Sequence, residues 1–297
     1  MLPPHDLHPP PEPRDVIAQP QASKAQIMRT RVTLPTGVEL DVIQSGDPTG
    51  VPLLLLHGLS DSAPSMRPLM DELPRGVRAI AISQRGHGDS SKPPGPYTTA
   101  AFVADAAAAL DKLGVRRAVV FGHSMGSVVA QRFALAHPER TAGLILEGAF
   151  PGLQGNAAVQ AFYDAGIACL RDPIDPAFAR GFQESTLARP VPPAFLGAVT
   201  IETCKLPANA WRAILTDMMA DDLTPELSAI QAPTLLIWGD QDGFVSLGDQ
   251  ERLLAGIKGS ALSTFAGTGH APHWEEPARA AQVIAAFISR HVAPVAA

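Results

Sequence analysis

The feature that most constrains the fold is a nine-residue stretch, residues 119–127, in which an apolar run ends in Gly-x-Ser-x-Gly. Residues 119–121 have the character of a buried strand, and helical spacing follows from residue 127 to residue 137. A strand, a sharp turn and a helix are therefore expected within a few residues. At the apex of such a turn the backbone is strained and crowded, which explains the two glycines and leaves the Ser124 hydroxyl accessible to a substrate.

The helix after this turn favours an anion close to Ser124, because its first N–H groups and its dipole are directed at that position. Three fixed positions also occur by chance in unrelated proteins. The interpretation of Ser124 as a nucleophile therefore needs a base, an acid and an oxyanion hole from other parts of the chain.

The composition is that of a globular protein with a sizeable core, since 46% of the 297 residues are hydrophobic and 18% are charged. This length suits one large α/β domain with an insertion, or two ordinary domains. The net charge is −6 and no long Lys/Arg cluster is present, so nucleic acid is not an expected partner.

Cys169 and Cys204 do not lie at the spacing of metal ligands, and no metal site is expected. No segment reaches 18 apolar residues, so a membrane span is not predicted. The first residues lack the basic and apolar regions of a secretory signal. These observations together predict a cytoplasmic enzyme.

The order of the predicted elements indicates a mostly parallel sheet flanked by helices. A hairpin over residues 27–34 and 38–44 precedes an alternation of buried strands and helices, as in βαβ units. Strands are predicted over residues 51–56, 77–82, 118–121, 144–146, 234–238 and 261–265, and helices over 65–73, 99–113, 247–256 and 277–290. Before them, residues 1–25 are rich in proline and are predicted to form an extended arm, which leaves a homodimer open.

Residues 148–229 break this alternation with four helical stretches and no strand-like run. We interpret them as a helical cap (lid) inserted into a core made of residues 26–147 and 230–297. The candidate pocket residues come from the cap and from the loops around the predicted site: His57, Glu147, Phe150, Phe162, Trp211, Leu215, Met219, Phe244 and Trp274.

Loops at the carboxyl ends of the predicted strands carry the polar residues that the serine needs. His57-Gly58 follows a buried strand and allows the N–H of Leu59 to join that of Met125 in an oxyanion hole. His57 is expected to brace this loop, although it could also act as a base. An acid in Gly239-Asp240-Gln241-Asp242 and a histidine in Gly269-His270 follow the last two strands.

These four motifs, in this order, resemble the α/β-hydrolase superfamily, in its capped serine esterase and carbon-carbon hydrolase branch, over residues 27–291. The resemblance implies that Ser124 is the nucleophile and His270 its general base and acid. Asp242, the second acid of its motif, would orient His270, while Asp240 braces the loop. No cofactor or metal is implied.

Glu147 is an alternative acid, because it directly follows the next strand and some members of the superfamily take their acid from this position. We expect it to be a pocket residue instead. His123 and His273 flank catalytic residues and are expected to be structural.

The serine at the apex excludes dehalogenase and epoxide hydrolase chemistry of this fold, which needs a carboxylate there. We therefore predict hydrolysis of a small carboxylic ester or lactone through an acyl-enzyme. Alternatives are a carbon-carbon hydrolase of aromatic ring-cleavage products, a cofactor-free perhydrolase, and a non-catalytic ligand-binding protein of the same fold, which an intact triad argues against.

Overall fold

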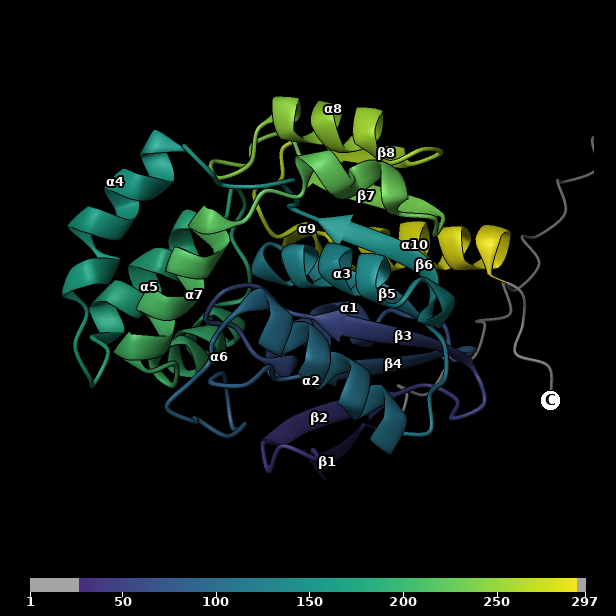
Figure 1. The fold of residues 1–297 in the computed structure, drawn as a ribbon, viewed down its shortest axis with the longest axis horizontal. Coiled ribbons are helices and arrows are strands. Elements are labelled where there is room, and N and C mark those ends of the chain that lie inside the picture. The colour runs from purple at the N-terminus through teal and green to yellow at the C-terminus, as the bar shows by residue number, and fades with distance from the viewer. Residues whose placement is uncertain (1–26, 293–297) are drawn as a thin grey trace, which may run out of the picture.

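An eight-stranded sheet runs through the protein, and the computed structural model describes residues 27–292 around it (Figure 1). The arm predicted over residues 1–25 lies outside this range. The strand order is β1-β2-β4-β3-β5-β6-β7-β8. The strands are β1 (Met28–Thr33), β2 (Glu39–Ser45), β3 (Val51–Leu56), β4 (Val77–Ile82), β5 (Ala118–His123), β6 (Thr141–Glu147), β7 (Thr234–Gly239) and β8 (Ala261–Phe265).

The sheet is parallel from β4 to β8, which confirms the predicted fold class. Only β2, among the described strands, runs against its neighbours, since it pairs antiparallel with both β1 and β4. All the parallel strands therefore end at one edge. Loops that follow them meet at this edge, where α/β folds bind ligands.

Alternate residues of the central strands enter two different hydrophobic cores. In β3, Leu54 and Leu56 belong to the core that α2 (Thr99–Lys112) and α3 (Met125–Ala136) cover. Leu53 and Leu55 belong to the core on the other face, under α1 (Arg67–Met70) and α10 (Pro277–His291) (Figure 1). Burial on both faces explains why this strand has an uninterrupted apolar sequence.

The helices follow the predicted pattern with two differences. The segment predicted over residues 65–73 is a 3₁₀ turn, Ala63–Met66, and the single helical turn α1, and Pro74 follows it closely. The short α9 (Pro272–Glu275) was expected to be a loop. Among residues 27–292, no helix has the length and apolarity needed to cross a bilayer. The remaining helices are α4 (Ala157–Ala165), α5 (Pro176–Ser185), α6 (Pro193–Cys204), α7 (Ala208–Ala220) and α8 (Leu247–Gly256).

Helices α4 to α7 belong to the segment between β6 and β7, which we call the inserted segment (residues 148–229). They lie together beyond the edge to which the β6 arrow points (Figure 1). Trp211 of α7 is fully buried and packs edge-on against Phe178 and Phe182 of α5. The inserted segment thus contributes a group of packed aromatic side chains at the edge where the strands end.

Candidate active site

Ser124 lies between β5 and α3 in a strained backbone conformation, with φ 52° and ψ −118°. Its N–H donates to the carbonyl oxygen of Glu147 at 2.9 Å, which fixes the turn to the end of β6. A Cβ on Gly122 would lie 2.1 Å from the carbonyl oxygen of Gly126, and a Cβ on Gly126 would lie 2.2 Å from that of Leu56. Only glycine fits these two positions, as the motif predicted.

Ser60, in the loop after β3, has the other positive φ angle (66°) among the non-glycine residues that the structure describes. Two strained residues therefore flank one site, and backbone strain of this kind concentrates at functional sites. Leu59 lines the same pocket as Ser124. Met125 is the first residue of α3, so its N–H has no acceptor within the helix. These two N–H groups stay our prediction for the oxyanion hole.

His270 is paired with Asp242, the acid that the sequence favoured. Its Nδ1 lies 2.7 Å from Asp242 Oδ2, and the carboxylate is fully buried. The N–H groups of Phe244 and Val245 donate to the other oxygen, Oδ1, at 2.8 and 3.0 Å. Because a carboxylate accepts the proton on Nδ1, Nε2 is left free to accept a proton from a substrate or nucleophile.

Asp240, two residues earlier, has a different environment. Its Oδ1 accepts a hydrogen bond from the N–H of Gly267 at 2.6 Å, which joins the loops after β7 and β8. This contact fits the bracing role expected from the sequence.

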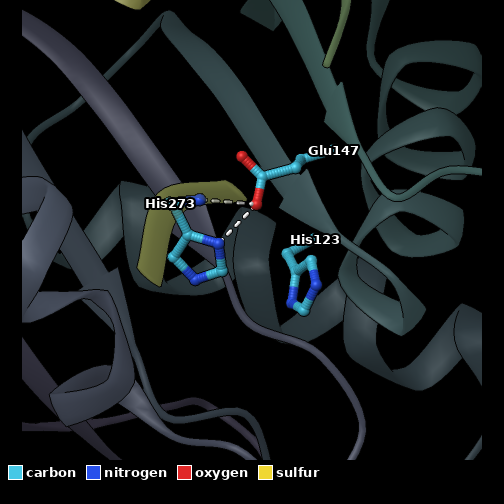
Figure 2. Close-up of side chains that lie close together, drawn as sticks. All are labelled: His123, Glu147 and His273. Carbon is cyan, nitrogen blue, oxygen red and sulfur yellow. Dashed lines mark hydrogen bonds and ion pairs between the residues drawn. The ribbon is translucent and has the colours of Figure 1, made fainter. Parts of the chain in front are cut away.

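Glu147 contacts His273 rather than His270 (Figure 2). Both side chains are fully buried, and Glu147 Oε1 accepts from Nδ1 of His273 and from its backbone N–H at 3.3 Å. Glu147 is not among the residues that line the pocket. The expectation that it is a pocket residue is therefore corrected, because its carboxylate points into the interior and is held there by α9.

His123 lies beside this pair and links it to the loop that carries His270. Its Nε2 donates to the carbonyl oxygen of His270 at 3.0 Å, so its Nδ1 carries no proton. Burial, with His273 and His270 nearby, holds the pKa of His123 well below its ordinary value. Donor atoms of His123, Glu147 and His273 lie within 4.8 Å of one another (Figure 2), and such donors can bind transition metals. Glu147 and His273 here bond directly to each other.

His57 lies behind the loop that follows β3, away from the pocket wall. Its Nε2 accepts from the N–H of Gln84 at 2.9 Å, and its Nδ1 donates to the carbonyl oxygen of Gly58 at 2.8 Å. Burial, with His87 nearby, holds its pKa well below the ordinary value. With both nitrogens engaged, His57 braces the loop, and its expected place in the pocket is corrected.

A pocket with a cavity volume of about 90 Å³ lies between the carboxyl edge of the sheet and the inserted segment. Five of the predicted pocket residues line it: Phe150, Phe162, Leu215, Phe244 and Trp274. Trp211 does not, because its indole is enclosed by the packed aromatic side chains of the inserted segment. From the same helix, Leu215 and Met218 line the pocket, and the predicted Met219 does not.

Three polar residues of the pocket, Asp61, Gln183 and Thr186, were not among the predicted site residues. Asp61 and Gln183 line the cavity and are almost completely buried. Asp61 lies two residues after Leu59, so an acid so close to a predicted oxyanion donor was the signal available in the sequence. Gln183 is one polar residue on a helix, and nothing in the sequence distinguishes it.

Glu275 of α9 joins the inserted segment to the loop that carries His270. Its carboxylate accepts from the N–H groups of Gly269 (2.9 Å), Ala188 (3.2 Å) and Arg189 (2.9 Å). Burial raises the pKa of Glu275, and these three donors oppose the rise. The carbonyl oxygen of Thr186 also accepts from the N–H of His270 at 2.8 Å. The inserted segment thus helps to position the histidine.

Comparisons with known proteins identify the family of this chain. The model of the Alpha/beta hydrolase family matches residues 53–283. The AB hydrolase superfamily protein YisY of Bacillus subtilis is 29% identical over 249 residues, which cover 80% of this chain and 91% of that protein. A 2-hydroxymuconate semialdehyde hydrolase of a Pseudomonas strain is 29% identical over 276 residues, covering 87% of this chain and 93% of that protein. Among solved structures, a thermophilic esterase from Thermogutta terrifontis is 26% identical, with a TM-score of 0.77, over 90% of this chain and 100% of that one.

Proposed function

Because this chain belongs to the alpha/beta hydrolase family, we propose that it is a serine hydrolase that cleaves carboxylic esters or lactones. One observation carries the proposal: His270, paired with a buried Asp242 at 2.7 Å, lines the same pocket as the strained Ser124. A non-catalytic binding protein has no need of this arrangement. The solved esterase to which the chain is similar supports the same class of reaction.

The proposed reaction begins with attack of Ser124 Oγ on the carbonyl carbon of the ester. His270 Nε2 takes the proton of the hydroxyl and then gives it to the leaving alcohol. The N–H groups of Leu59 and Met125 stabilise the oxyanion, each by about 3 kcal/mol if they act as known donors do. Water, activated by His270, then releases the acid from the serine.

The 29% sequence identity to a 2-hydroxymuconate semialdehyde hydrolase favours one second candidate function, hydrolysis of carbon-carbon bonds. Its substrates would be vinylogous diketones from aromatic ring cleavage, and the same serine and histidine would serve. A ring-cleavage product tested beside simple esters distinguishes the two reactions.

The test is steady-state hydrolysis of p-nitrophenyl acetate, butyrate and octanoate by the wild type and three variants. We expect no turnover by Ser124→Ala. For Asp242→Asn we expect a loss of about 10⁴-fold in kcat, because the imidazole of His270 is no longer held in the tautomer with its proton on Nδ1. Glu147→Gln is the matched control and should lose less than tenfold, since its carboxylate bonds to His273.

An exchange of behaviour between the two acid variants would move the acid to Glu147. If the folded wild type hydrolyses none of these esters but cleaves the ring-cleavage product, the carbon-carbon reaction replaces the ester reaction.

A further inference from the structure

The apolar pocket contains a polar pair at one place in its wall, Asp61 and Gln183. Phenylalanine, leucine, valine and methionine side chains make up much of the rest of the lining. As whole residues, Asp61 and Gln183 are 3% and 1% exposed. Asp61 comes from the loop after β3, and Gln183 comes from α5 of the inserted segment. The two parts of the protein that enclose the pocket therefore each contribute one polar group.

Both N–H groups of the Gln183 amide are already used in hydrogen bonds, one to Asp61 and one to Thr203. Gln183 Nε2 donates to Asp61 Oδ1 at 2.9 Å and to Thr203 Oγ1 at 2.6 Å. The hydroxyl of Thr203 in turn donates to the carbonyl oxygen of Val199. The amide of Gln183 thus has no N–H left for a ligand, and its orientation is fixed by these two acceptors.

The pair has acceptor capacity left. Within residues 27–292, no donor reaches Gln183 Oε1. The carboxylate of Asp61 accepts from the Gln183 amide and from the backbone of Gly58, which is fewer than the roughly four hydrogen bonds that a carboxylate can accept. His123 Nδ1 lies 3.8 Å from Asp61 Oδ2, but this nitrogen carries no proton because Nε2 donates to His270. Thr186, the other polar residue of this wall, donates its hydroxyl to the carbonyl oxygen of Gln183. Around Asp61 and Gln183 the wall therefore offers side-chain acceptors, and the hydroxyl of Thr186 is already used.

A buried carboxylate without its full set of donors is unfavourable in the empty pocket, so a ligand that supplies a donor is favoured there. An anionic ligand is disfavoured, because its charge would oppose that of Asp61 in a medium of low polarity. A hydroxyl group meets both conditions, since it donates one hydrogen bond and carries no charge.

We propose that Asp61 and Gln183 form a subsite that binds a hydroxyl group of the substrate, so that hydroxylated esters are preferred over their unsubstituted analogues. This inference rests on the proposed ester hydrolysis and names its substrate class. Asp61 and Gln183 determine specificity in it, and Ser124 and His270 carry out the reaction.

The test compares three pairs of esters that differ by one hydroxyl group: ethyl lactate with ethyl propanoate, ethyl 3-hydroxybutyrate with ethyl butyrate, and 2-hydroxyethyl butyrate with propyl butyrate. Acid release at constant pH 7.5 gives kcat/KM for each. For at least one pair we expect the wild type to prefer the hydroxylated ester about tenfold or more, as a charge-assisted hydrogen bond allows. Ethyl hydrogen succinate, which is anionic, should be a poor substrate.

Asp61→Asn keeps the size of the side chain and an oxygen for Gln183. It should bring the hydroxyl preference close to unity and raise the activity on ethyl hydrogen succinate, relative to ethyl butyrate, about tenfold. Gln183→Met should also weaken the preference, while Asp71→Asn, a surface acid paired with Arg67, should leave every ratio unchanged. A rise in activity on the anionic ester cannot come from a misfolded variant.

The outcomes separate this inference from the proposed function. If the wild type hydrolyses the parent esters without any hydroxyl preference, or if the preference persists in Asp61→Asn, the subsite is wrong and the esterase proposal stands. If the wild type hydrolyses none of the esters, the esterase proposal fails and the subsite fails with it.

Discussion

Asp61 is a carboxylic acid enclosed by an apolar pocket, and its burial raises its pKa to about 6. Gln183 and the nearby His273 and His270 oppose this rise but do not cancel it. The folded protein therefore holds the proton of Asp61 more tightly than the unfolded chain, in which the ordinary value is 3.8. By linkage, Asp61 stabilises the folded state most at low pH, and this contribution is lost as the pH rises through about 6.

We predict that this loss is visible as a difference between the wild type and Asp61→Asn. The free energy of unfolding of the wild type, relative to the variant, should fall by about 2 kcal/mol between pH 4 and pH 7.5. Urea unfolding at several pH values measures it. The histidines near Asp61 are present in both proteins, so their own titration affects the stability of both. A difference in unfolding free energy that stays constant across this pH range would contradict the prediction.

The positions of the proposed catalytic residues at one edge of the sheet could be predicted because local rules determine them. The tight turn that carries Ser124 requires two glycines that no other residue can replace. Asp242 and His270 follow strands that end at the same edge. The direction of a buried side chain is different, because it depends on contacts between distant segments. Glu147 turns toward His273, and Trp211 turns toward the other aromatic side chains of the inserted segment. Neither direction is recorded in the local sequence.

At the scale of the elements, α9 connects two parts of the candidate active site that lie far apart in the sequence. Glu275 accepts from the backbone of the loop that carries His270 and from the backbone of residues 188 and 189. Periodicity predicted helix 247–256 and strand 261–265 with the bounds that the structure has, although the strand predicted over 144–146 is longer, Thr141–Glu147. It could not predict α9, because a single turn is too short to show a period.

We predict that Glu275→Gln loosens this connection. One of the carboxylate oxygens becomes an NH₂ group that faces a backbone N–H, which should lower the free energy of unfolding by about 1–3 kcal/mol. It should also increase proteolytic cleavage within residues 148–229 in the native protein. Limited proteolysis beside Glu251→Gln, an exposed acid on α8, measures the effect. Equal cleavage of the two variants would show that Glu275 does not hold the inserted segment.

At the scale of the whole molecule, the inserted segment and the sheet share one hydrophobic core. Ile167, Trp211 and Ile214 of the inserted segment belong to the same buried cluster as Val128 and Phe133 of α3. Since apolar contacts are continuous across the two parts, we expect them to unfold together rather than one after the other.

Trp211→Ala tests this coupling. Removal of the buried indole should cost about 3–5 kcal/mol, and the loss of helix signal and of active-site structure should still follow a single urea transition. Circular dichroism and the fluorescence of the other tryptophans report the two events. Ile201→Ala, at a side chain that is 63% exposed, is the control and should change stability by less than about 0.5 kcal/mol. Two separate transitions would mean that the inserted segment is an independent unit.

The inserted segment leaves the sheet after β6 and returns to it at β7, and these two strands are direct neighbours in register. Its two ends are therefore anchored side by side, whatever lies between them. The stretch of the gene that encodes the inserted segment can therefore lengthen, shorten or be exchanged for another. The strands that present Ser124, Asp242 and His270 keep their alignment when it does. New substrate ranges can evolve, or be engineered by recombination, through this single stretch, provided that the replacement supplies partners for α3, Glu275 and Asp61.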